Sequence, residues 1–140
     1  MLTTGIKGNS ERIVTKELTA RAMGSGELPV LATPAAVALA EETAWRSVAP
    51  YLEPGQGTVG TQLQFEHISA TPVGMKVRCE TELIEIDRRK LTFSVAAYDE
   101  AGLVLKGKHC RFIVENEKFL EKAEKKAEDA GCRLEVNHEV

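Results

Sequence analysis

Residues 31–48 read LATPAAVALAEETAWRSV and carry the apolar period of a long helix. Thr33 is expected to cap its start, because a threonine hydroxyl can accept from the first unpaired backbone N–H groups of a helix. Pro34 suits the first helical position, where the missing N–H is not needed. Pro50 is expected to stop the helix. The segment therefore predicts a helix from about residue 34 to residue 49.

This predicted helix carries a glutamate within its apolar side. On the 3.6-residue period Glu41 falls inside an apolar stripe made of Val37, Ala44, Trp45 and Val48. Glu42 falls outside the stripe and precedes Arg46 by four residues, which is the spacing of a surface ion pair. A carboxylate on an apolar face costs free energy unless it has a partner or a function. Glu41 is therefore a candidate site residue, and Glu42 is expected at the surface.

The rest of the chain predicts an antiparallel sheet. Alternation of apolar and polar residues predicts a short edge strand before the helix and four long strands after it, at residues 11–18, 58–70, 75–87, 91–97 and 103–114. In residues 58–70 the odd-numbered side chains from Val59 to His67 are expected to face the helix, with Gly60 pointing away. A single helix with an apolar face is buried when a curved sheet wraps around it. We therefore predict an α+β fold in which the sheet encloses the long helix.

The chain divides into one main domain and a charged appendage. Residues 1–116 hold the predicted helix and sheet, with a loop at residues 21–29 that could cover a site as a lid. Residues 117–140 are rich in Glu, Lys and Ala and predict a C-terminal surface helix followed by a tail that contains His138.

Charge and composition exclude several classes of function. A net charge of −3 and a pI of about 5.7 argue against a general nucleic-acid-binding protein. No apolar run approaches the roughly 20 residues that span a bilayer, so no membrane partner is expected. Three widely spaced cysteines fit neither a disulfide framework nor a zinc site, so we expect a cytoplasmic protein without a metal.

His67 is the second candidate site residue. Taken alone, a histidine at the end of an inward-facing run is more simply a core residue that donates to a backbone carbonyl. A strand packed over the helix would, however, bring His67 near Glu41. Thr33 lies at the helix N-terminus, where backbone N–H groups favour negative charge. A threonine, a glutamate and a histidine beside such donors suit acyl transfer.

Four motifs and their spacing resemble the hot-dog-fold thioesterases similar to fluoroacetyl-coenzyme A thioesterase. They are Val30-Leu-Ala-Thr33-Pro34, Glu41-Glu42, Gly57-Thr-Val-Gly60-Thr and His67-Ile-Ser-Ala-Thr71-Pro72-Val-Gly74. The resemblance extends from about Thr15 to Val114.

The resemblance implies an acyl-CoA thioesterase that needs no cofactor. Thr33, Glu41 and His67 would act together on the thioester. Gly60 would lie near the thioester carbonyl, and Arg111 would occupy the place of a supporting arginine. A homodimer or higher oligomer is implied, with two helices side by side and each site at the subunit interface. Whether Glu41 or His67 activates water stays open.

The loop before the helix bears on the substrate. The fluoroacetyl-specific enzyme uses phenylalanines in its lid, whereas residues 20–28 here contain no aromatic residue. We therefore expect a short or small acyl group rather than fluoroacetyl specificity. Two alternatives on the same fold are a non-catalytic acyl-CoA-binding module and an enoyl-CoA hydratase-like enzyme. The three candidate catalytic residues favour the hydrolase.

Overall fold

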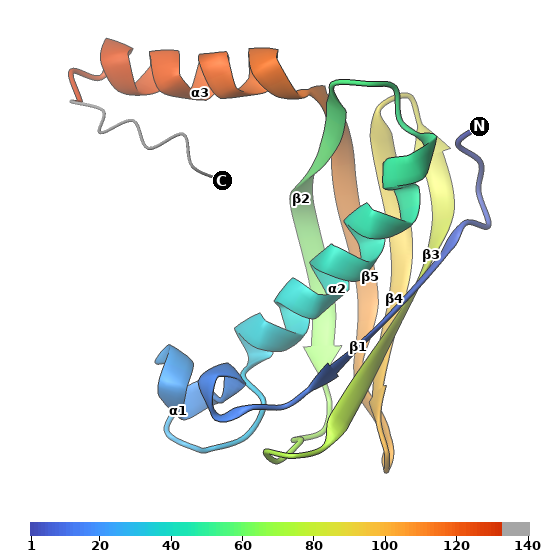
Figure 1. Cartoon of the computed structure of the whole chain (residues 1–140), viewed down its shortest axis with the longest axis vertical. Coiled ribbons are helices and arrows are strands. Elements are labelled where there is room, and N and C mark those ends of the chain that lie inside the picture. The colour runs from blue at the N-terminus through green and yellow to red at the C-terminus, as the bar shows by residue number, and fades with distance from the viewer. Residues whose placement is uncertain (133–140) are drawn as a thin grey trace.

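A computed structural model describes residues 1–132 of the chain (Figure 1). Its elements are β1 (Lys7–Ile13), a 3-10 turn (Lys16–Leu18), α1 (Ala20–Met23), α2 (Thr33–Val48), a second 3-10 turn (Ala49–Tyr51), β2 (Gln56–His67), β3 (Lys76–Asp87), β4 (Lys90–Asp99), β5 (Gly102–Glu115) and α3 (Asn116–Asp129).

The strands form one antiparallel sheet in the order β1-β3-β4-β5-β2. The sheet curves around α2, which crosses its concave side (Figure 1). The predicted α+β fold, a long helix wrapped by a curved antiparallel sheet, is confirmed. The predicted first strand is at an edge of the sheet, but it begins at Lys7 rather than at residue 11, and residues 16–18 form a 3-10 turn instead.

The helix packs closely on the sheet because its buried side is made mostly of small residues. The buried residues of α2 are Ala35, Ala36, Leu39, Ala40, Thr43, Ala44 and Val48. The closeness is clear at Gly8 of β1, where a Cβ atom would lie 2.7 Å from the carbonyl oxygen of Thr43. The predicted stripe was partly wrong, because Trp45 is 41% exposed and stacks with Arg46 instead of entering the core. Glu41 lies at the edge of the buried stripe, with 38% of its side chain exposed.

A bulge in β2 changes which side chains face α2. Gly60 pairs with Arg111 of β5, but Gln62 pairs with Cys110, so Thr61 is an extra residue. Thr58 and Gly60 face the concave side before the bulge, and Phe65 and His67 face it after the bulge. The predicted alternation is therefore wrong for the first half of β2, because one inserted residue reverses the facing of all those on one side of it.

The C-terminal helix stands apart from the sheet. None of the residues of α3 is buried, and the helix leaves the end of β5 at the side of the molecule (Figure 1). The predicted surface helix is confirmed. The predicted tail, with His138, lies outside the described residues. Within residues 1–132, every helix is too short or too polar to cross a membrane.

Candidate active site

The first group of candidate residues lies at the start of α2. The helix begins at Thr33, and its N-cap residue is Ala32. The methyl side chain of Ala32 cannot accept a capping hydrogen bond. The predicted capping role of Thr33 is therefore wrong. Its hydroxyl instead forms a hydrogen bond of 2.8 Å with Nδ1 of His67, the last residue of β2. The strand and the helix N-terminus thus hold these two side chains together.

The other ring nitrogen of His67 has no protein partner. Nε2 is buried and makes no hydrogen bond with any atom of residues 1–132. Thr33 and His67 line a cavity of about 300 Å³, and residues 25–28 and 68–70 also line it. A buried polar atom without a partner is costly in a folded protein. His67 is therefore suited to bind a group that enters this cavity.

The loop predicted as a lid contributes residues 25–28 to the lining of this cavity, and hydrogen bonds join the two ends of the loop. The backbone N–H of Ala20 donates to the carbonyl of Val30 at 2.8 Å, and that of Arg21 donates to Leu28 at 3.1 Å. The Arg21 side chain also donates through Nε to the carbonyl oxygen of Glu27 at 3.0 Å. No Phe, Tyr or Trp lines the cavity among the described residues.

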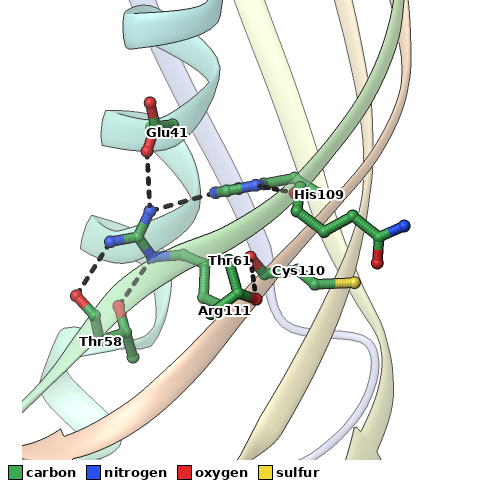
Figure 2. Close-up of polar contacts among 7 residues, drawn as sticks. Glu41, Thr58, Thr61, His109, Cys110 and Arg111 are labelled. Atoms are coloured by element: carbon green, nitrogen blue, oxygen red, sulfur yellow. Dashed lines mark hydrogen bonds and ion pairs between the residues drawn. The ribbon is translucent and has the colours of Figure 1, made fainter.

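The second group lies two turns further along α2, around Glu41. Arg111 of β5 places Nη1 3.5 Å from Oε2 of Glu41 (Figure 2). Its Nε donates to the hydroxyl of Thr58 at 2.8 Å, and its Nη2 donates to the Thr58 carbonyl at 2.9 Å. The Arg111 side chain is only 7% exposed. Burial lowers the pKa of Arg111, and the charge of Glu41 opposes that change.

Because Gly60 has no side chain, the Glu41 carboxylate can occupy the space beside this part of β2. A Cβ atom built on Gly60 would lie 2.8 Å from Oε2 of Glu41 and 3.4 Å from Nη1 of Arg111. The first distance is shorter than side chains tolerate, so any other residue would push the carboxylate away. The bulge at Thr61 and the missing side chain together bring the backbone of β2 against Glu41.

His109 is a further member of this group, and it is not among the site residues predicted from the sequence. Its ring is fully buried, and its Nδ1 lies 2.9 Å from the carbonyl oxygen of Gln62. Nη1 of Arg111 lies 3.1 Å from Nε2 of His109 (Figure 2). Burial lowers the pKa of His109, and the bond to Gln62 opposes this while the charge of Arg111 adds to it. The signal in the sequence was its spacing, since residues 109 and 111 share one face of a strand.

The two groups are separate within one protomer. No hydrogen bond among residues 1–132 joins Glu41 to Thr33 or His67. Eight residues separate Thr33 from Glu41 on α2, which is about 12 Å along the helix axis. The structure therefore joins Thr33 with His67, and Gly60 and Arg111 with Glu41, but it does not bring Glu41 and His67 into direct contact.

In the part of the chain that the structure describes there is no metal cluster, and the Cys79 thiol is not activated. Among residues 1–132 no three His, Cys, Asp or Glu side chains lie where they could share a metal ion. Burial raises the pKa of Cys79 to about 11, so this thiol stays protonated and is a poor nucleophile.

Comparison with known proteins assigns the chain to a family. A family model described as fluoroacetyl-CoA-specific thioesterase matches residues 14–117. The chain belongs to this family. The fluoroacetyl-CoA thioesterase of Streptantibioticus cattleyicolor is 39% identical over 97 residues, which are 69% of this chain and 70% of that protein. As a member of this family, the protein is a thioester hydrolase.

Solved structures of similar proteins confirm the hot-dog fold. A structure of the fluoroacetyl-CoA thioesterase has a TM-score of 0.85 and 33% identity, covering 90% of this chain and 98% of its own. A thioesterase superfamily member from Thermus thermophilus has a TM-score of 0.83 and 27% identity, covering 93% and 98%. A hot-dog-like protein from Thermanaerovibrio acidaminovorans, at 16% identity and a TM-score of 0.82 over 89% and 93%, shares the fold.

Proposed function

We propose that the protein hydrolyses acyl-CoA thioesters that carry a short or small acyl group, and that it is not specific for fluoroacetyl-CoA. The observation that carries this proposal is the Thr33–His67 pair. One ring nitrogen of His67 is held by Thr33, and the other is buried, unpartnered and beside a cavity of about 300 Å³. This arrangement fits a histidine that exchanges a proton with a bound group.

The proposed reaction is attack of water on the thioester carbonyl carbon. The water proton passes to Glu41 or His67, or Glu41 attacks first and water then releases the acyl group. The C–S bond breaks, and the thiolate of coenzyme A takes up a proton as it leaves. Thr33 orients the ring of His67 throughout.

In this proposal, the residues around Glu41 stabilise the developing charge and hold the carboxylate. The Gly60 N–H would donate to the carbonyl oxygen as it becomes an oxyanion. Arg111 would hold the Glu41 carboxylate in place through its Nη1 contact.

The composition of residues 25–28 supports the expectation that the protein accepts more than one kind of acyl group. Residues 25–28, which line the cavity, are Ser, Gly, Glu and Leu, so no ring closes over the acyl group. Glu27 adds a negative charge at this rim. We therefore expect neutral short acyl groups to be accepted in preference to dicarboxylic ones, because like charges repel.

Release of thiol from a panel of acyl-CoAs tests the function. Acetyl-, propionyl-, butyryl-, fluoroacetyl- and malonyl-CoA are incubated with the protein, and free thiol is followed with a thiol reagent. We expect release from several neutral members without a strong preference for fluoroacetyl-CoA. Binding without release on every member would favour the acyl-CoA-binding module. Loss of enoyl absorbance from crotonyl-CoA, with the thioester intact, would favour the hydratase.

We also infer a homodimer in which each site lies at the subunit interface. The separation of the two residue groups within one protomer supports this, as does the free edge of β2. Leu63 lies on β2 with 48% of its surface exposed, which suits a residue covered by a second copy.

Light scattering after gel filtration tests the dimer. We expect twice the chain mass of 15.3 kDa for the parent, and a monomer without activity for Leu63→Arg. The matched control is Leu120→Arg on α3, where Leu120 is 59% exposed and a dimer is expected to persist. A fully active monomer would contradict the shared site.

The division at residue 116 is a further part of the proposal. The family model ends at residue 117, and α3 buries none of its residues. A chain that stops after Glu117 is expected to keep its thioesterase activity. Its Tm is expected to change by less than about 4 °C, because little buried surface is lost.

A further inference from the structure

The ring of His109 has only one tautomer that satisfies both of its neighbours. The carbonyl oxygen of Gln62 can only accept a hydrogen bond, so Nδ1 of His109 must carry the proton and donate across 2.9 Å. The guanidinium of Arg111 can only donate, so Nε2 must offer its lone pair across 3.1 Å. His109 is thus neutral, with each nitrogen committed to one partner.

The surroundings of the ring hold it in this orientation. Its centroid lies 6.3 Å from those of Phe65 and Phe93, with Phe93 stacked at 29°. The backbone that supplies the Gln62 carbonyl follows directly after the bulge in β2. The position of Nε2 is therefore determined by packed rings and a strand irregularity, and not by contact with solvent.

The lone pair on Nε2 of His109 is one of the groups that accept from the Arg111 guanidinium. Thr58 accepts from Nε and Nη2, which leaves Nη1 as the nitrogen that meets both His109 and Glu41. The bond to His109 is the shorter of the two, at 3.1 Å against 3.5 Å. The charged groups that face His109 are Arg111 on its own strand and Glu41 on α2. Nε2 therefore directs the nitrogen that contacts the Glu41 carboxylate.

We propose that His109 is a positioning residue, which aims the Arg111 guanidinium at Glu41 through the lone pair on its Nε2 atom. This inference rests on the proposed function of Glu41. His109 does not touch the thioester. Its loss would misplace the carboxylate, and small misplacements of a reacting group cost up to about 10²-fold in rate.

Two substitutions test the two hydrogen bonds of the His109 ring one at a time. His109→Gln can present an oxygen near the place of Nε2 and keep an acceptor for Arg111. His109→Asn reaches only the place of Nδ1 and can keep the bond to Gln62, but it offers Arg111 nothing. We expect kcat within about threefold of the parent for His109→Gln, and a loss of about 10-fold or more for His109→Asn with little change in KM. Equal kcat values for the two variants would overturn the proposal.

A double-mutant cycle adds a readout that a purely structural role would not change. In the Arg111→Lys background, His109→Asn is expected to cost less than about twofold further, because the guanidinium it positions is already absent. Fully multiplicative losses would overturn the positioning role.

Glu41→Gln is measured beside these variants. If it is inactive while His109→Asn is as active as the parent, the positioning role fails and the proposed function stands. If Glu41→Gln is fully active, the proposed role of Glu41 fails, and the positioning role of His109 fails with it.

Discussion

The two ends of the candidate site are built in opposite ways on one helix. At the N-terminus of α2, the Thr33–His67 pair has a single hydrogen bond, an unpartnered ring nitrogen and an adjoining cavity. Two turns later, Arg111 makes four polar contacts around Glu41 and is almost fully buried. The difference teaches that the protein leaves a buried polar atom unpartnered at one end, whereas at the other end it supplies the polar partners itself.

The largest effects are expected from the two residues that would move protons. Glu41→Gln and His67→Ala should each lower kcat by about 10²–10⁴, because a general acid or base contributes that much. Steady-state thiol release on an accepted acyl-CoA measures the loss, and gel filtration checks that the dimer persists. Near-normal turnover in both folded variants would show that neither Glu41 nor His67 moves a proton in the reaction.

Gly60→Ala should be the next most damaging change. The added methyl would lie 2.8 Å from the Glu41 carboxylate, so the Glu41 end of the site must open to accommodate it. We expect kcat to fall by about 10²-fold, which is the cost of a misplaced reacting group. A Gly60→Ala enzyme as fast as the parent would show that Glu41 has room to move.

Thr33→Val should have a moderate effect. It removes the one hydrogen bond that orients His67, and such a bond contributes about 1 kcal/mol, or less than about tenfold in rate. Thr33→Ser keeps the hydroxyl and is expected to stay close to the parent. The ratio of kcat between the two variants is the measurement. A serine variant as slow as the valine variant would mean that the methyl group matters and the hydroxyl does not.

The smallest expected effect is a pH dependence of stability. The pKa of His109 is lowered from 6.5 in the folded chain, so the unfolded chain takes up this proton first as the pH falls. The contribution of the neutral ring is complete above about pH 6.5 and is lost as the pH falls from there toward the lower folded pKa. Tm should therefore decline less from pH 7.5 to 5 in His109→Gln than in the parent. Parallel Tm curves would indicate that His109 does not titrate on unfolding.

The fold could be predicted because its signals are local. The apolar period of residues 31–48 and the alternation at Leu91, Phe93, Val95 and Ala97 need no knowledge of the partner elements, and all four strand residues are buried. Residue patterns alone named Thr33, Glu41 and His67 as candidates, and the family resemblance added Gly60 and Arg111. Their arrangement was harder to predict, because it depends on contacts between distant strands.

Two errors have the same physical origin. Trp45 was placed in the core because periodicity cannot tell which apolar residues a sheet will cover and which it will leave at the edge. Thr33 was read as a cap because its hydroxyl has a common local use, whereas the structure gives that hydroxyl to a histidine 34 residues away. His109 was not predicted as a site residue for the same reason, because its partners, Gln62 and Arg111, meet only across the pairing of β2 with β5.

The extra residue in β2 makes one strand serve both ends of the site. Even-numbered positions reach the concave side before Thr61, and odd-numbered positions reach it afterwards. Thr58 and Gly60 can therefore support Glu41 while His67, on the same strand, meets Thr33. A strand that kept Thr61 but paired it in regular alternation would put these two sets of side chains on opposite faces. Deleting Thr61 would instead leave both sets on the concave side, because Gly60 and His67 would then be six residues apart. The bulge thus corrects the parity of the strand, since it lets residues an odd number of positions apart share one face of the sheet.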